Sequence, residues 1–217
     1  LRAELAAHGF AGKLLLCGDH EIALAGAMQT PGCVLIAGTG SICYGKNAAG
    51  EHFRCGGGGH IIDDPGSGYA LGRDALAAAL QTEDGRLSEN ALHGAVMDTV
   101  GGSGIQGIFD FVYFSRRGKG DIAALAPLVL RCAAQGDAVS LDILRRGAAE
   151  LARLVSAVMG KLGLENGSPC ALTGGLLAED NVYRRAVCTA LAPFCRPAAP
   201  EHDALFGAVQ LALAAIQ

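Results

Sequence analysis

A tight turn of glycines and hydroxyl residues, Gly38-Thr39-Gly40-Ser41, stands between two short apolar runs and has the composition of an anion-binding loop. Such a turn leaves backbone N–H groups free, and the missing Cβ atoms let phosphate oxygens come close to the chain. It is not a Walker A loop, because that motif's lysine and its eight-residue frame are absent. The turn therefore predicts a phosphate site, and an ordinary tight hairpin is the alternative.

Asp19 is a candidate for proton transfer. It follows residues 13–18, a run predicted as a buried strand, and it precedes a helix predicted over 21–28. Open α/β sheets expose functional side chains at the carboxyl ends of their strands. A carboxylate there can accept a proton from a substrate hydroxyl that faces a bound phosphate, as phosphoryl transfer requires. Aspartate is also a favoured helix cap, so both roles stay open.

Residues 55–69 contain four consecutive glycines followed by a histidine and a pair of aspartates. Consecutive glycines cost backbone entropy on folding and are expected where the backbone passes close to another group. Asp63 and Asp64 can bind sugar hydroxyls, bind a metal ion, or cap the helix predicted from Ser67. For Asp63 we expect a cap or a solvated carboxylate, and for His60 a structural role. The spacing identifies no particular metal.

Thr173-Gly174-Gly175 repeats the glycine turn late in the chain, after a predicted strand and before a predicted helix. Two glycines there allow the backbone to approach a flat ring or a ribose closely. A plain turn at the end of a strand is the other interpretation.

The elements that must position these residues fall into two halves. The first ninety residues alternate short apolar runs with glycine turns, whereas residues 85–165 are patterned almost entirely as helix. The longest predicted helix begins near Asp137 and is stopped by Gly163. The other predicted elements are strands at 33–37, 42–46, 51–55 and 170–173, helices at 88–98, 121–135, 179–191 and 203–216, and a strand or loop at 193–200.

Composition excludes several classes of protein. Of the 217 residues 51% are hydrophobic and 18% are charged, with a mean hydropathy of +0.33, so the chain is not intrinsically disordered. Seventeen Lys and Arg against 21 Asp and Glu do not favour a nucleic-acid partner. The chain lacks an uninterrupted apolar run of about 18 residues, which predicts a soluble protein without a membrane partner. Eight cysteines without a CxxC pair favour a reduced, cytoplasmic compartment.

Taken in order, these features resemble the N-acetylglucosamine kinase and BadF/BadG/BcrA/BcrD ATPase group of the actin-like, sugar-kinase and Hsp70 superfamily. The match rests on Asp19, the turn at 38–41, the stretch 56–69, the turn at 173–175 and a closing helix after residues 201–208. The resemblance implies an α/β, ribonuclease-H-like domain with a largely helical insertion at about 85–165. Residues 1–217 would be the C-terminal portion of a two-domain kinase, and the N-terminal phosphate-1 domain would be absent from this chain.

The resemblance also implies roles for individual residues. ATP and a sugar such as N-acetylglucosamine or glucosamine would bind between two domains, with Mg²⁺. Asp19 would be the catalytic base. The other expected roles are ATP binding by Gly38, Thr39, Gly40, Gly174 and Gly175, and substrate binding by Asp64, Gly40 and Ser41. A homodimer is compatible with this interpretation.

Three departures from the family pattern leave the acceptor sugar open. The family's opening Asp-Gly-Gly-Gly-Thr segment is missing, so residues 1–217 alone are not expected to catalyse the reaction. Gly58 stands where many members carry Trp, and Ile42 where some carry Asn. Two other functions stay open: an ATPase that activates an acyl-CoA dehydratase or reductase through an iron–sulfur cluster, and a non-catalytic sugar-binding regulatory domain.

Overall fold

A five-stranded sheet in the order β3-β2-β1-β4-β5 forms the centre of the computed structural model, which describes residues 2–29, 31–101, 103–114 and 116–216. The strands are β1 (Gly32–Ala37), β2 (Ser41–Lys46), β3 (His52–Gly56), β4 (Pro169–Thr173) and β5 (Arg196–Ala198). β1, β2 and β3 pair antiparallel, whereas β4 pairs parallel with β1 and with β5. The carboxyl ends of β1 and β4 therefore meet at one edge of the sheet.

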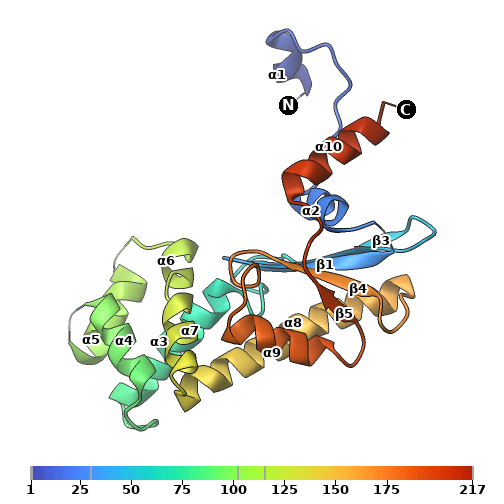
Figure 1. Ribbon diagram of the computed structural model, residues 1–217. Coiled ribbons are helices and arrows are strands. Elements are labelled where there is room, and N and C mark those ends of the chain that lie inside the picture. The colour runs from blue at the N-terminus through green and yellow to red at the C-terminus, as the bar shows by residue number, and fades with distance from the viewer. Residues whose placement is uncertain (1, 30, 102, 115, 217) are drawn as a thin grey trace.

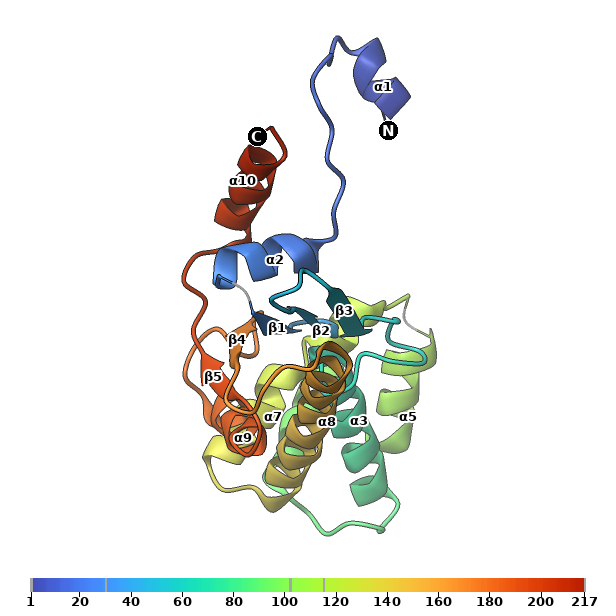
Figure 2. The same ribbon diagram turned by 90° about the vertical axis from the view of Figure 1, so that its right-hand side faces the viewer.

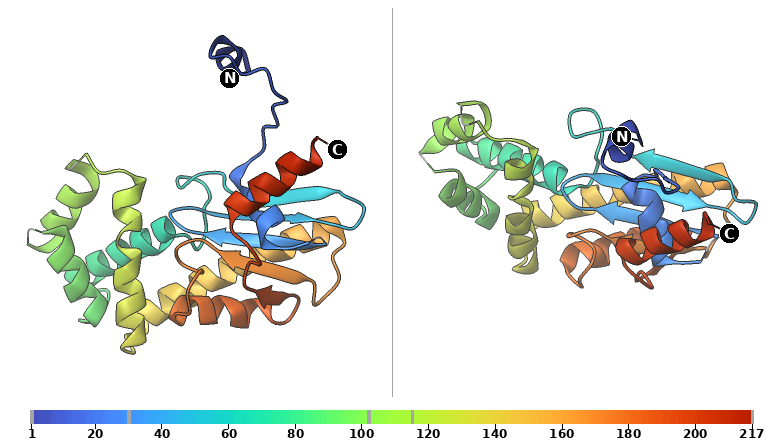
Figure 3. Two further views of the ribbon diagram at one scale, coloured as in Figure 1. Left: turned by 45° about the horizontal axis from the view of Figure 1, so that its top comes forward. Right: turned by 90° about the horizontal axis from the view of Figure 1, so that it is seen from above.

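Helices cover both faces of this sheet (Figures 1 and 2). One face carries α2 (Asp19–Ala27), against whose outer side α10 (Ala204–Ala214) packs, and the other carries α8 (Ala138–Leu162) and α9 (Val182–Leu191). The helices between β3 and α8 extend beyond the sheet, as both views in Figure 3 show. They are α3 (Gly68–Glu83), α4 (Ala91–Val100), α5 (Gly104–Phe109), a π-helical turn η1 (Asp110–Phe114), α6 (Lys119–Ala123) and α7 (Ala126–Ala134).

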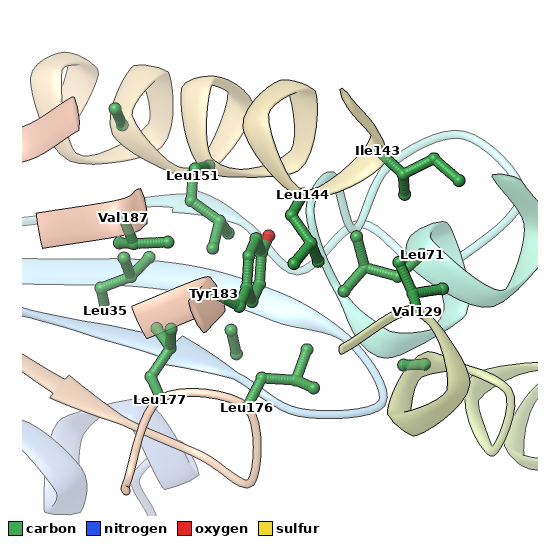
Figure 4. Packing of buried hydrophobic residues seen from close by; sticks show 14 of the residues in the cluster. Leu35, Leu71, Val129, Ile143, Leu144, Leu151, Leu176, Leu177, Tyr183 and Val187 are labelled. Atoms are coloured by element: carbon green, nitrogen blue, oxygen red, sulfur yellow. The ribbon is translucent and has the colours of Figure 1, made fainter. Parts of the chain in front are cut away.

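The main core lies between the sheet and α8. The apolar stripe of α8 is buried against β2 and β3, and its neighbours in the cluster come from α3, α7 and α9 (Figure 4). Tyr183 of α9 is fully buried, and its hydroxyl donates a 2.7 Å hydrogen bond to the carbonyl of Gly66. Burial raises the pKa of this phenol. The core thus holds the loop that leads into α3.

Local signals explain where the long helices begin and end. Ser67 caps α3 by accepting from the Ala70 N–H at 3.2 Å, and Asp137 caps α8 by accepting from the Ser140 N–H at 2.8 Å. Gly163 ends α8 in the left-handed conformation, with φ +60°. The predicted start of α3, the predicted start and end of α8, and the predicted hairpin of β2 and β3 are confirmed.

The buried strand predicted at 13–18 is wrong. This segment is extended but pairs with no strand in the described part of the chain, and Leu15 and Leu16 are 50% and 68% exposed. It runs from α1 (Arg2–Ala7) to α2 away from the sheet (Figure 2). A short apolar run predicts burial, but a strand also needs a neighbouring edge to bond.

Within the described residues, no single helix is both long and apolar enough to cross a bilayer. One bent pair, Lys119–Ala134 with Ala138–Leu162, passes the same test of length and composition only when taken together.

Candidate active site

The turn at 38–41 connects β1 to β2 and is held by the first residues of α3. The Gly38 carbonyl accepts from the Gly68 N–H at 2.7 Å, and the Thr39 carbonyl accepts from the Tyr69 N–H at 3.3 Å. Within the described chain, the N–H groups of Thr39 and Gly40 donate no hydrogen bond to protein. The turn therefore uses its carbonyls for structure and keeps two amides for a ligand, which suits an anion.

Asp64 reaches this turn from the glycine-rich stretch. Its side chain is 4% exposed; one carboxylate oxygen accepts from the Ser41 N–H at 3.1 Å, and the other accepts from Lys119 Nζ at 2.6 Å. Among the described residues, Asp64 is the only non-glycine residue with a positive φ, which is +58°. Left-handed backbone of this kind costs free energy, and the surrounding bonds maintain it.

Gly40 lies where the turn, the carboxylate and the ammonium meet. A Cβ atom on Gly40 would lie 2.9 and 3.0 Å from the two Asp64 oxygens and 3.0 Å from Lys119 Nζ. The position therefore excludes a side chain, because both charged groups occupy that space.

The second glycine turn lies beside the first. Ile36 and Thr173 are register partners in the parallel pairing of β1 with β4, so both strands end at the same level. Gly174 has φ +90°, and a Cβ there would overlap the Ala37 carbonyl. Gly175 is exposed, and nothing lies within 4 Å of its Cβ position. The structure thus brings Gly174 and Gly175 to the edge that carries residues 38–41.

Asp19 takes a different place from the one the sequence suggests. It is the exposed first residue of α2, on the opposite face of the sheet from α8, and no hydrogen bond or ion pair joins it to another described residue. It does not cap the helix, because Gly18 is the N-cap and its N–H donates to Glu21 at 2.8 Å. The structure shows no contact between Asp19 and the turn at 38–41.

The remaining polar residues of the glycine-rich stretch brace the loop. Asp63 accepts from the Gly58 N–H at 2.8 Å and stays partly exposed, so it does not cap α3, whose N-cap is Ser67. The His60 ring lies edge-on to Tyr69, with centroids 4.7 Å apart. Asp63 closes the turn locally, which leaves Asp64 to reach across to the strand.

The model of the BadF/BadG/BcrA/BcrD ATPase family matches residues 2–212. The chain belongs to this family. Its five-stranded α/β architecture is that of the family's actin-like fold, as the resemblance implied.

Two curated relatives of this BadF/BadG-family chain are named as sugar kinases. The chain is 36% identical to the N-acetylmuramic acid/N-acetylglucosamine kinase of Clostridium acetobutylicum over 209 residues, which cover 94% of the chain and 68% of that protein. It is 32% identical to the N-acetyl-D-glucosamine kinase of Dictyostelium discoideum over 178 residues, covering 80% of the chain and 54% of that protein.

Solved structures agree with the fold. A structure described as an N-acetylglucosamine kinase of Chromobacterium violaceum superposes with a TM-score of 0.76 at 32% identity, covering 97% of this chain and 70% of that one. A second, from Porphyromonas gingivalis, superposes with a TM-score of 0.66 at 18% identity, covering 88% and 62%, and supports the fold alone.

Lys119 is the site residue that the sequence analysis missed. It precedes the helix predicted at 121–135 and lies 55 positions from Asp64 in the sequence. No local pattern marks such a pair. The one sequence signal is that Lys119 lies between two glycines, Gly118 and Gly120, which would allow its backbone to pack closely against another segment.

Proposed function

We propose that this member of the BadF/BadG family acts, within its full-length protein, as an ATP-dependent kinase of an N-acetylated amino sugar. The arrangement of the turn at 38–41, Asp64 and Gly174-Gly175 along one sheet edge carries the proposal. The names of the relatives support the acceptor class. Because the chain spans 54% and 68% of those two kinases, the complete activity is proposed for the protein that contains this chain.

In this proposal the free amides of Thr39 and Gly40 bind the nucleotide phosphates, Gly38 completes the turn, and Gly174-Gly175 pack against the adenosine. The sugar binds on the side of the turn that carries Gly40, and the buried pair of Asp64 and Ser41, joined by the 3.1 Å hydrogen bond, supports that side from beneath. Asp19 accepts the proton of the attacking sugar hydroxyl, whose oxygen bonds to the γ-phosphorus while the bond from that phosphorus to the β–γ bridging oxygen breaks. The products are a sugar phosphate and ADP.

Mg²⁺ enters the proposal as the counter-ion of ATP. Among the described residues there is no group of three or more His, Cys, Asp or Glu side chains arranged to hold a metal ion. Magnesium in such enzymes is commonly held by substrate phosphates, waters and one or two carboxylates.

The cysteines do not favour an activating ATPase of the iron–sulfur type. A cluster shared between subunits needs thiols at the surface, but Cys17 is the single exposed cysteine of the described chain. The kinase is therefore the function that the site supports best. We also propose a cytoplasmic location, because a kinase of this kind needs both ATP and an N-acetylated amino sugar, and both are present in the cytoplasm.

The test is an ADP-release assay on the protein expressed from its complete reading frame, with N-acetylglucosamine, N-acetylmuramic acid, glucosamine, glucose or no sugar. We expect ADP release to depend on an N-acetylated sugar and the product to carry one phosphate. ATP hydrolysis without sugar would favour an ATPase instead. Sugar binding without turnover would favour a regulatory domain.

A further inference from the structure

Lys119 forms an ion pair unlike the others in the described chain. Its ammonium lies 2.6 Å from Asp64, and the two side chains are 31% and 4% exposed. The carboxylates of the other ion pairs are at least 21% exposed. Exposed pairs of that kind contribute little, whereas a charge as buried as Asp64 requires a partner.

Tertiary packing brings Lys119 to this place. It is the first residue of α6, and Gly118 before it is held by a 2.8 Å bond from its N–H to Asp121. α6 lies against α3 at glycine: a Cβ on Gly72 would overlap the Ile122 carbonyl, and one on Gly68 would lie 3.5 Å from Ala123. This close contact sets the start of α6 beside the turn at 38–41.

Asp64 creates an electrostatic problem for the proposed phosphate site. Its carboxylate oxygens lie within 3.0 Å of the Cβ position of Gly40, whose amide is free for an anion. A negative charge so close, in a mostly buried setting, repels an approaching phosphate. The ammonium of Lys119 lies at the same distance from that point, so the pair is close to neutral there.

We infer that Lys119 is a positioning residue that neutralises Asp64 and so allows an anionic nucleotide to reach the turn at 38–41. The inference rests on the proposed function only in placing nucleotide phosphate at this turn. Through Lys119, the helical segment between α3 and α8 then contributes electrostatically to nucleotide binding.

The test compares four variants of the full-length protein by titration with ADP in the absence of sugar. Lys119→Met should weaken ADP binding by about tenfold or more, because Asp64 is left unbalanced. Lys119→Arg keeps the charge and should retain most of the affinity. The double variant Asp64→Asn with Lys119→Met removes both charges and should recover most of what Lys119→Met loses. Lys161→Met, at the exposed end of α8, is the control for loss of one lysine.

Unchanged ADP affinity in Lys119→Met would overturn the inference. So would a double variant that binds ADP as poorly as Lys119→Met, because the loss would then come from a direct contact of the ammonium with the nucleotide. Thermal unfolding of each variant separates these results from loss of the fold. Charge-dependent ADP binding without sugar-dependent turnover would leave this inference standing and reject the kinase proposal, and the reverse pattern would reject only the inference.

Discussion

A substitution at Gly175 can test nucleotide binding without disturbing the fold. Nothing lies within 4 Å of its Cβ position, and its φ is not positive, so Gly175→Ala should change the free energy of unfolding by less than about 0.5 kcal/mol. If adenosine packs against this turn, the added methyl group should weaken ATP binding several-fold. Titration with ATP and urea unfolding give the two values.

The matched control is Gly174→Ala. At Gly174 the φ of +90° and the overlap with the Ala37 carbonyl should lower stability as well as binding. Gly175→Ala with unchanged affinity for ATP would remove Gly175 from the nucleotide site.

Asp19 allows an equally direct test of the catalytic base. Because this side chain is exposed and makes no hydrogen bond with a described residue, Asp19→Asn should leave the unfolding midpoint unchanged. Turnover of the full-length kinase should fall by about 10²-fold or more if the carboxylate takes the hydroxyl proton. The rate of ADP release at saturating sugar measures this.

Asp98→Asn, at another exposed aspartate without a described partner, should keep the wild-type rate and serves as the control. A near-normal rate for Asp19→Asn would exclude it as the base and leave the proton acceptor to be found elsewhere.

At the scale of elements, the contact of α3 with α6 determines where Lys119 stands. A methyl group at Gly72 would meet backbone, which cannot move aside as a side chain can, so Gly72→Ala should destabilise the protein by about 1–3 kcal/mol. It should also weaken ADP binding, because displacing α6 draws the ammonium away from Asp64. Urea unfolding and ADP titration check both effects.

Gly94→Ala is the matched control in a helix. Nothing lies within 4 Å of its Cβ position on the exposed face of α4, so alanine should stabilise the helix by about 0.5–1 kcal/mol. Equal effects of the two substitutions would mean that the close packing of α3 with α6 does not matter.

Elements with local signals could be predicted from the sequence, and elements defined by a partner could not. The stripe and caps of α8 lie within one segment, so period and cap residues were sufficient. Residues 13–18 are as apolar as a buried strand, but nothing in their own sequence says whether an edge is available to them. The turns at 38–41 and 173–175 could each be recognised, whereas their meeting depends on the parallel pairing of β1 with β4. The pairing of Lys119 with Asp64 depends on helix packing and left no local trace.

Across the whole molecule, the sheet carries the candidate site at the carboxyl ends of β1 and β4 and buries three cysteine thiols at its centre. Cys33 and Cys170 are register partners on β1 and β4, and Cys43 lies on β2 in the same core under α8. Burial raises the pKa of the Cys43 thiol. The fold thus keeps Cys33, Cys43 and Cys170 inside the core, and none of the three is in a disulfide.

This arrangement predicts how the cysteines react. The thiolate is the attacking species, so a raised pKa and burial both slow alkylation of Cys43 at neutral pH. In the native protein we expect one fast thiol, Cys17, and two slower ones, Cys55 and Cys188, which are half-buried. The other five should react only after denaturation: Cys33, Cys43, Cys132, Cys170 and Cys195. Timed labelling with iodoacetamide and peptide mass spectrometry would assign each rate, and Cys17→Ser should remove the fast phase. A fast reaction at Cys43 or Cys170 would show that the sheet opens to solvent, which contradicts a closed core beneath α8.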